Sequence, residues 1–287
     1  MFRMKPKSFF LELLLCKHCN LKCKGCNRWS NIAEEEFYDF EDLKNDLLEL
    51  KKSNIFIDVF SLIGGEPLLY PNLRELIYFL KDNFKKSSIS IFTNGSLCLS
   101  LDNETLNSLK KCQLIISEYK KSSINYNKIY NFLDLYNIKH NTLYEIDKDE
   151  NLKDGISYFG RFQLSKYSTQ SAYSHKIKCM CDVPCLWKGY FYGCSREAFL
   201  DTLNKYFNED FKCTHKLNVK EIKSYIQMFR FFMSPSELCK NCLSTFYNYH
   251  DDDISWTRNN IERIDFILDD KNSDKNNLCD LTNTMMQ

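Results

Sequence analysis

The sequence lacks a hydrophobic run of the length that a membrane-spanning helix needs. Its longest purely apolar stretch surrounds Leu13 and Leu15 and is far shorter than the roughly 20 residues that cross a bilayer. Residues 1–8 also lack a hydrophobic run followed by a cleavage site of small residues, so we expect no signal peptide. Together these absences predict a soluble cytoplasmic protein with no membrane partner, in which disulfide bonds are not expected.

An excess of one charge is missing as well, and glycine and proline are scarce. The chain has 39 basic and 38 acidic residues, which are intermixed and leave a net charge of +1. A nucleic-acid-binding protein needs a basic face, so the charge predicts no nucleic-acid partner. With 8 glycines and 5 prolines in 287 residues, and 44% hydrophobic residues, the composition is typical of a folded protein with a sizeable core.

Strand-like and helix-like segments alternate through the first half of the chain. Strands are predicted over residues 9–15, 55–63, 88–93, 113–117 and 138–146, and helices over residues 40–53, 71–84, 103–110 and 126–136. In the first of these helices Leu43, Leu47 and Leu50 recur at helical spacing. Such alternation predicts an α/β fold with a parallel sheet and helices on its outer face. Folds of this kind bind ligands at the carboxyl ends of their strands.

Cysteine is the residue that this chain has in abundance, with fourteen in all. Four of them lie within eleven residues directly after the first predicted strand, and Cys19, Cys23 and Cys26 have the spacing Cys-x3-Cys-x2-Cys. Three thiolates supply a four-iron cluster with all but one of its ligands, and the open position is typical of a site that does chemistry. The alternative is a zinc site that adds a distant Cys-x2-Cys pair. The fourth cysteine, Cys16, is interpreted as a small buried residue.

Two further motifs follow the next predicted strands. Gly64, Gly65, Glu66 and Pro67 come directly after the second strand, and Asn94 follows the third, so all of them are expected at the same sheet rim as the cysteine loop. The two glycines would let the backbone pass close to a bound molecule, and the carboxylate could receive a ligand ammonium group. Alone, the Gly-Gly-Glu-Pro motif would indicate only a tight turn. Beside the cysteine loop it predicts a binding site.

The cysteine spacing after the first strand, with Gly-Gly-Glu-Pro after the second, resembles the radical S-adenosylmethionine (radical SAM) superfamily over about the first 150 residues. The resemblance implies that Cys19, Cys23 and Cys26 bind a [4Fe-4S] cluster whose open iron chelates the amino and carboxylate groups of S-adenosylmethionine (SAM). It also implies that the glycine-rich motif receives the methionine end, with Asn94 and Ser117 as candidates for the ribose. The fold it implies is a partial (β/α)6-type barrel.

One position departs from the family pattern, because Gly25 stands where an aromatic residue commonly precedes the third cysteine. Trp29 is a candidate for packing against adenine, or alternatively a core or substrate contact. The resemblance implies that an external reductase such as flavodoxin or ferredoxin supplies an electron that cleaves SAM. The resulting 5′-deoxyadenosyl radical would abstract hydrogen from a substrate, which the protein must position. Glu118 and Tyr119, just past a strand end, are candidates for substrate contact.

A second group of cysteines follows in the other half of the chain. Its members are Cys179, Cys181, Cys185, Cys194, Cys239 and Cys242. Residues 186–194 are predicted to form a β-hairpin with its turn near Lys188 and Gly189, and a helix is expected over residues 219–232.

The pattern Cys-x9-Gly-x4-Cys followed by Cys-x2-Cys resembles the auxiliary-cluster module, called a twitch or SPASM-like domain, of certain radical SAM enzymes. The resemblance implies a second [4Fe-4S] cluster bound by four of these cysteines, namely Cys179, Cys194, Cys239 and Cys242. Cys185 and Cys181 are the substitutes for a ligand. A closed four-cysteine zinc site is the alternative.

These features predict that the chain is an enzyme and that it is divided into three parts. The radical SAM barrel is expected over residues 1–165, a small α+β cysteine-rich module over residues 166–250, and a short helix near 261–268 with a disordered tail over the remaining 251–287. Such an architecture resembles a radical SAM dehydrogenase that oxidises an aminocyclitol alcohol.

Dehydrogenation of a small polar, sugar-like or cyclitol-like substrate, with the auxiliary cluster as electron acceptor, is therefore the leading hypothesis. Arg28, Arg161 and Arg196 are available for carboxylate or phosphate groups of that substrate. A radical peptide-modifying enzyme and a non-enzymatic zinc or iron-sulfur protein are the alternatives.

Overall fold

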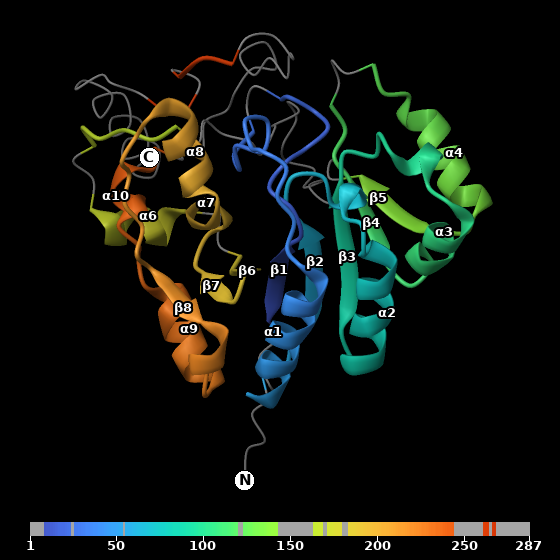
Figure 1. The fold of residues 1–287 in the computed structure, drawn as a ribbon, viewed down its shortest axis with the longest axis horizontal. Coiled ribbons are helices and arrows are strands. Elements are labelled where there is room, and N and C mark those ends of the chain that lie inside the picture. The colour runs from blue at the N-terminus through green and yellow to red at the C-terminus, as the bar shows by residue number, and fades with distance from the viewer. Residues whose placement is uncertain are drawn as a thin grey trace, which may run out of the picture.

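The computed structural model describes residues 9–23, 26–53, 55–119, 123–142, 163–168, 171–179, 183–243, 261–263 and 266–267. In these ranges the chain forms an eight-stranded sheet with the order β5-β4-β3-β2-β1-β6-β7-β8 (Figure 1). The strands are β1 (Phe10–Leu14), β2 (Val59–Ile63), β3 (Ser88–Thr93), β4 (Gln113–Ile116), β5 (Lys139–Thr142), β6 (Cys185–Trp187), β7 (Tyr190–Tyr192) and β8 (Lys216–Asn218). The α-helices are α1 (Phe40–Lys52), α2 (Leu73–Asn83), α3 (Asn103–Leu109), α4 (Tyr126–Leu135), α6 (Ala172–Lys178), α7 (Ser195–Ala198), α8 (Leu200–Phe207), α9 (Tyr225–Met233) and α10 (Leu238–Asn241). Short 3₁₀ helices are η1 (Pro67–Leu69), η2 (Cys98–Ser100) and η3 (Val219–Glu221).

The sheet is open and mostly parallel. Strands β1 to β5 all pair in parallel, and β6 joins the free side of β1 in parallel before β7 and β8 continue in antiparallel fashion. Figure 1 accordingly places β6, β7 and β8 on the side of β1 that faces away from β5. This α/β architecture is consistent with the partial barrel that was expected.

The (β/α)6 count is not met in the part of the chain that the structure describes. Five parallel strands come from the first half, and the sixth parallel strand, β6, is the first strand of the cysteine-rich hairpin. Without β6, the strand β1 would be an edge strand with unpaired backbone groups, and this accounts for the pairing of the hairpin with β1. The backbone N–H of Glu12 donates to the carbonyl of Pro184 at 3.0 Å, so the hairpin satisfies that edge.

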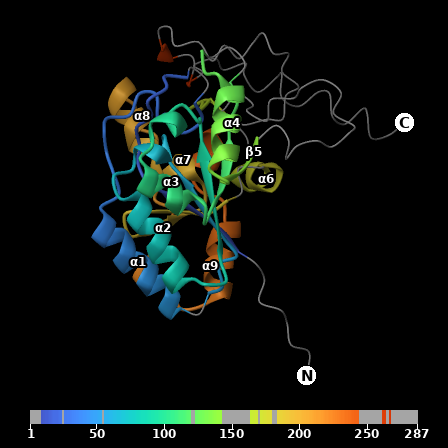
Figure 2. The same ribbon diagram turned by 90° about the vertical axis from the view of Figure 1, so that its right-hand side faces the viewer.

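Helices with an apolar face, such as α1, α2 and α4, pack beside the sheet. In α1 the buried face is formed by Leu43, Leu47 and Leu50, and the carboxylate of Asp39 caps the helix by accepting from the backbone N–H groups of the first turn. Figure 2 shows α1, α2 and α3 on one side of the molecule and α6 and α9 on the other. None of the helices in the described ranges is both long and apolar enough to cross a membrane.

The hairpin predicted around Lys188 and Gly189 is confirmed. Both residues have positive φ angles, 44° and 81°, which is the backbone of a two-residue hairpin turn. The helix expected over residues 219–232 is wrong in part, because it is broken into η3 and α9. Ser224 starts α9 by accepting from the backbone N–H of Gln227, and such a side-chain cap competes with a continuous helix.

Several expectations fall mostly outside the described residues. The fifth strand of the first half is described only from Lys139 to Thr142, and the tail beyond residue 267 is not described. Part of the short helix near residues 261–268 is described, and there Ile267 forms a parallel bridge with Leu164 instead of continuing a helix.

Candidate functional site

The cysteine loop leaves the carboxyl end of β1 and is tied to its neighbours by backbone hydrogen bonds. Leu15 N donates to the carbonyl of Ile63 at 2.8 Å, and Tyr38 N donates to the carbonyl of Leu15 at 2.9 Å. Cys16 is fully buried, its thiol donates to the carbonyl of Glu66, and burial raises its pKa to about 12. Cys16 therefore serves as an anchor for the loop, in keeping with its interpretation as a buried residue.

The other three cysteines of the loop line one cavity of about 240 Å³. Cys26 N donates to the carbonyl of Cys23 at 3.2 Å, and the side chain of Asn31 donates to the same carbonyl at 2.7 Å. Leu21 N approaches the sulfur of Cys19 at 3.4 Å, which makes that sulfur an acceptor, although burial raises the pKa of the Cys19 thiol. A turn of backbone thus presents the three sulfurs to one space.

We call this space the rim cavity, because it lies at the carboxyl ends of β1 to β4. Of the residues that the sequence predicted for the cluster and for SAM, it is lined by Cys19, Cys23, Cys26, Gly64, Gly65, Glu66, Asn94 and Ser117. Pro67 is not among the lining residues; it is buried and begins η1 behind the rim. Gly25 lies outside the described residues.

Two glycines allow the cysteine loop to pack directly on the rim. A Cβ atom on Gly65 would lie 1.7 Å from the carbonyl oxygen of His18, and one on Gly64 would lie 2.4 Å from that of Cys16. Gly64 also has a φ of 149°, which side chains rarely adopt. Gly65 N donates to the carbonyl of Cys16 at 2.8 Å, and Glu66 N donates to the carbonyl of His18 at 3.1 Å. The two segments therefore meet backbone to backbone, with no room for a side chain.

Glu66 is 1% exposed, and its carboxylate joins the ends of β2 and β3. It accepts hydrogen bonds from Leu68 N at 3.0 Å, from Thr93 Oγ1 at 2.7 Å and from Asn94 N at 2.9 Å. Burial raises the pKa of Glu66 to about 7, against the effect of these three donors. The carboxylate thus holds the rim together, a role that the motif alone did not predict.

Asn94 and Ser117 lie at the ends of β3 and β4. The side-chain amide of Asn94 donates to Asn20 Oδ1 at 2.9 Å and approaches the sulfur of Cys19 at 3.7 Å, so it touches the cysteine loop. Tyr119 lines the same cavity, and burial raises the pKa of its hydroxyl. Glu118, by contrast, is exposed, accepts from the hydroxyl of Tyr130 and does not line the cavity.

The sequence interpretation missed an ion pair in the rim cavity. Glu12 on β1 and Arg28 both line it, and their side chains, 12% and 18% exposed, pair at 3.0 Å. The Arg28 Nε–H also donates to Ser195 Oγ at 3.1 Å. Arg28 was expected to be available for a substrate anion, but in the structure it is already paired. A lone carboxylate in an otherwise apolar strand was the signal that could have pointed to Glu12.

Cysteines of the second group line another cavity, which we call the C-terminal cavity. It is lined by all four of the cysteines expected as ligands, namely Cys179, Cys194, Cys239 and Cys242. Cys179 follows α6, Cys194 follows β7, and the last two belong to α10 and its end. The substitute Cys185 is buried in β6 and does not line this cavity, and Cys181 lies outside the described residues.

Cationic side chains surround the C-terminal cavity. Arg196 is 2% exposed, and its Nη1 donates to the sulfur of Cys242 at 2.7 Å. Burial lowers the pKa of His175, but hydrogen bonds to Cys179 and Cys242 outweigh this and raise it to about 9. Arg196, expected to be available for a substrate, is therefore held inside the protein. Arg161 lies outside the described residues.

The position of Trp29 does not fit the expectation that it packs against adenine. It is fully buried, and the guanidinium carbon of Arg196 lies 5.0 Å from the centre of its ring. Since Trp29 does not line the rim cavity, it is a core residue and is not positioned to pack against adenine.

Residues 13–117 match the model of the radical SAM superfamily. The match covers 105 of the 287 residues, and over these residues the chain is similar to that superfamily. Two similar curated proteins are the GTP 3′,8-cyclases of Trichodesmium erythraeum (strain IMS101), 37% identical over 94 residues, and of Microcystis aeruginosa (strain NIES-843 / IAM M-2473), 34% identical over 100 residues. The matches cover 31% and 33% of this chain and only 28% and 29% of those cyclases.

A similar fold occurs in the crystal structure of BtrN in complex with AdoMet and 2-DOIA, with a TM-score of 0.53 and 19% identity. That match covers 86% of this chain and 98% of BtrN. The likeness therefore extends beyond residues 13–117 into the second half of the chain, and at this identity it concerns the fold alone.

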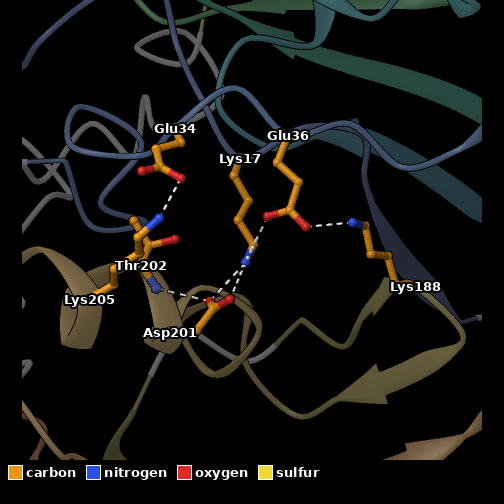
Figure 3. A network of polar contacts seen from close by, with 7 residues as sticks. All are labelled: Lys17, Glu34, Glu36, Lys188, Asp201, Thr202 and Lys205. Atoms are coloured by element: carbon orange, nitrogen blue, oxygen red, sulfur yellow. Dashed lines mark hydrogen bonds and ion pairs between the residues drawn. The ribbon is translucent and has the colours of Figure 1, made fainter.

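An ion-pair network connects the cysteine loop to the second half of the chain (Figure 3). The ammonium of Lys17, whose side chain is 5% exposed, lies 2.6 Å from Asp201 on α8 and 3.1 Å from Glu36. Glu36 also pairs with Lys188 in the hairpin turn. Because Lys17 directly follows Cys16, the network fixes the base of the cysteine loop against the hairpin and α8.

Among the residues that the structure describes, no three His, Cys, Asp or Glu side chains are arranged so as to hold a single metal ion. This applies to the cysteines of the rim cavity and to those of the C-terminal cavity alike.

Proposed function

We propose that this protein is a radical SAM enzyme whose rim cavity binds a [4Fe-4S] cluster and SAM. In this proposal Cys19, Cys23 and Cys26 are the cluster ligands. The observation that carries the proposal is that these three thiols share one cavity with the glycine-rich motif, at the carboxyl ends of four parallel strands. When bound, the cluster and SAM would supply a 5′-deoxyadenosyl radical.

The donor set fits such a cluster better than it fits zinc. In a zinc site all thiolates lie about 2.3 Å from one ion, so the sulfurs converge. In a four-iron cluster each cysteine binds a different iron, so the sulfurs lie farther apart around a larger space. The rim cavity offers three thiols, which leave one iron of a four-iron cluster open, whereas a structural zinc site takes four protein ligands, so the donor set of the rim cavity favours the cluster.

The chain's own residues would bind and orient SAM. Gly64 and Gly65 let the cysteine loop pack directly on the rim, and the carboxylate of Glu66, which lines the cavity, would receive the methionine ammonium group. Asn94 and Ser117, at the next two strand ends, are proposed to contact the ribose. The Glu12–Arg28 pair forms part of the wall that would keep the reacting groups away from water.

For the C-terminal cavity we propose a second [4Fe-4S] cluster, bound by Cys179, Cys194, Cys239 and Cys242. Four thiols around one space would close all four iron positions, so this cluster would carry electrons and leave no iron for SAM. Hydrogen bonds from Arg196 to Cys242, and from His175 to Cys179 and Cys242, would stabilise thiolates at these two positions, whereas burial raises the pKa of Cys194 and of Cys239. A zinc site is the alternative, and measurement of the iron and zinc content distinguishes it from the cluster.

The reaction that we propose is dehydrogenation of a small polar alcohol, such as a sugar or cyclitol. The carbinol carbon would lose a hydrogen atom to the deoxyadenosyl radical, then one electron to the second cluster and a proton from the hydroxyl, leaving a carbonyl. A reductase would supply the electron that cleaves SAM, and the second cluster would take up the electron released by the substrate, so that SAM would be the net two-electron oxidant. The fold likeness over most of BtrN supports this hypothesis.

The match to the curated cyclases supports the proposed cofactor. It does not support their reaction for this chain, because less than a third of their length is matched. Peptide modification is the other radical reaction to be tested. Supplying candidate alcohols or peptides deuterated at the reacting carbon distinguishes the two, since only the true substrate places deuterium in 5′-deoxyadenosine.

The experiment that tests the central proposal is anaerobic reconstitution with iron and sulfide, reduction with dithionite and measurement of 5′-deoxyadenosine. We expect about eight irons per chain and SAM cleavage. In the Cys19→Ala/Cys23→Ala/Cys26→Ala variant about half of the iron should remain and cleavage should be lost. Cys112→Ala, a buried cysteine outside both cavities, is the control. Stoichiometric zinc without SAM cleavage in the unsubstituted protein would contradict the proposal.

A further inference from the structure

Arg196 is a buried permanent charge between the two groups of cysteines. It is 2% exposed, it comes two residues after Cys194, and its Nη1 lies 2.7 Å from the sulfur of Cys242. Its guanidinium carbon lies 5.0 Å from the centre of the Trp29 ring, three residues after Cys26. Arg196 thus contacts Cys242, one of the proposed ligands in the C-terminal cavity. Through Trp29 it also contacts the loop that carries Cys26.

A guanidinium in such a place is costly unless something negative compensates it. Transfer of an ion from water to a protein interior costs several kcal/mol, and arginine does not lose its proton to avoid that cost. Trp29 offers the face of its ring, which contributes about 2 kcal/mol at most. A nearby anion adds to this compensation, and among the contacts of Arg196 is the sulfur of Cys242, to which its Nη1 donates a hydrogen bond.

Other charged side chains also line the C-terminal cavity, but neither Lys176 nor His175 carries a positive charge as permanent as that of Arg196. Lys176 and Glu197 both line it, one of each sign, and His175 contacts two of the sulfurs. Lys176 and His175 can lose their protons, whereas the charge of Arg196 is fixed over the accessible pH range. Arg196 is therefore the constant part of the positive field at this cavity.

We infer that Arg196 sets the reduction potential of the group bound by Cys179, Cys194, Cys239 and Cys242, and makes it a better electron acceptor. Reduction adds one negative charge, and a fixed positive charge in a low-dielectric site stabilises the reduced form over the oxidised form. The hydrogen bond to the Cys242 sulfur acts in the same direction. This inference rests on the proposed second cluster, whose role as acceptor requires such a potential.

The test uses the chain in which Cys19, Cys23 and Cys26 are replaced by alanine, so that the C-terminal cluster alone gives a signal. Arg196→Gln removes the charge and keeps a hydrogen-bond donor, and Arg196→Lys keeps the charge and loses the planar fork. Arg230→Gln, an exposed arginine on α9, is the matched control for loss of one positive charge. Midpoint potentials are measured by redox titration followed by electron paramagnetic resonance, with iron content measured in every sample.

We expect Arg196→Gln to lower the equilibrium constant for one-electron reduction by about tenfold or more, which is a fall of about 59 mV in the midpoint. Arg196→Lys should give a smaller fall in the same direction, and Arg230→Gln should match the parent. An unchanged midpoint in the Arg196 variants that keep their iron overturns the inference. Loss of iron from both Arg196 variants, with Arg230→Gln fully loaded, overturns it in favour of a purely structural role.

Failure of the proposed function has a different signature. If the parent lacking the three N-terminal cysteines holds no iron, or holds zinc, then the second cluster does not exist and the inference falls with it. If the parent holds about four irons and only the Arg196 effect is missing, the proposed second cluster stands and the inference alone is overturned.

Discussion

The hydroxyl of Thr93 donates a hydrogen bond of 2.7 Å to Oε1 of Glu66, and this contact joins the ends of two neighbouring strands. Glu66 ends the segment after β2 and Thr93 is the last residue of β3, so the buried carboxylate fixes the spacing of the rim. Any ligand ammonium group that Glu66 receives must share it with this internal partner. The glycine-rich motif is thus a structural element of the rim as well as a proposed binding element.

Stability of the metal-free protein should depend on pH through Glu66. Burial raises its pKa to about 7 from an ordinary value of 4.5, so the folded state binds a proton more tightly than the unfolded state does. The free energy of unfolding should therefore fall as the pH rises from about 4.5 to 7, by an amount on the order of 3 kcal/mol. Urea unfolding at several pH values measures it, and Glu66→Gln should flatten this part of the profile. An equal slope in both proteins would contradict the assignment.

Gly65→Ala should disrupt the rim cavity. The added Cβ would lie 1.7 Å from the carbonyl oxygen of His18, so the cysteine loop must move away from the glycine-rich segment. We expect a loss of more than 3 kcal/mol in the free energy of unfolding and loss of SAM binding. Gly193→Ala is the control, because its Cβ would meet only ordinary contacts at 3.7 Å or more. Normal SAM affinity of Gly65→Ala in equilibrium dialysis would refute the close packing.

Lys17→Met should weaken the attachment of the second half of the chain. The buried ammonium pairs with Asp201 and Glu36, which are themselves 72% and 36% exposed, so solvent compensates part of the loss. We expect a decrease of about 1 kcal/mol in the free energy of unfolding. Lys205→Met removes a pair in which both side chains are at least 70% exposed, and it should change stability by less than about 0.5 kcal/mol. Equal effects of the two variants would argue against a structural role for the network.

Cys179→Ala and Cys185→Ala should differ in iron content. Cys179 lines the C-terminal cavity, so its loss should remove the second cluster and about half of the iron. Cys185 is buried in β6 outside that cavity, so its replacement should leave the iron in place and lower the free energy of unfolding by about 1 kcal/mol. Iron assay and chemical denaturation measure the two effects. The reverse pattern would make Cys185 the ligand.

Much of the rim could be predicted because its signals are local. The cysteine spacing and the glycine-rich motif each lie within a few residues, and strand periodicity places both at carboxyl ends of parallel strands. The hairpin turn at Lys188 and Gly189 was predictable for the same reason. The role of Pro67 was not, because whether a motif residue faces the cavity depends on how the following turn packs.

The sequence by itself determined the alternation of strands and helices, the two groups of cysteines and the hairpin that carries Cys194. Only the tertiary structure decided that this hairpin completes the edge of β1, that Glu12 pairs with Arg28, and that Arg196 lies between Trp29 and Cys242. These contacts join segments that are far apart in the chain. Local pattern and propensity specify elements, but the pairing of distant edges and the burial of a charge depend on how those elements close around one another.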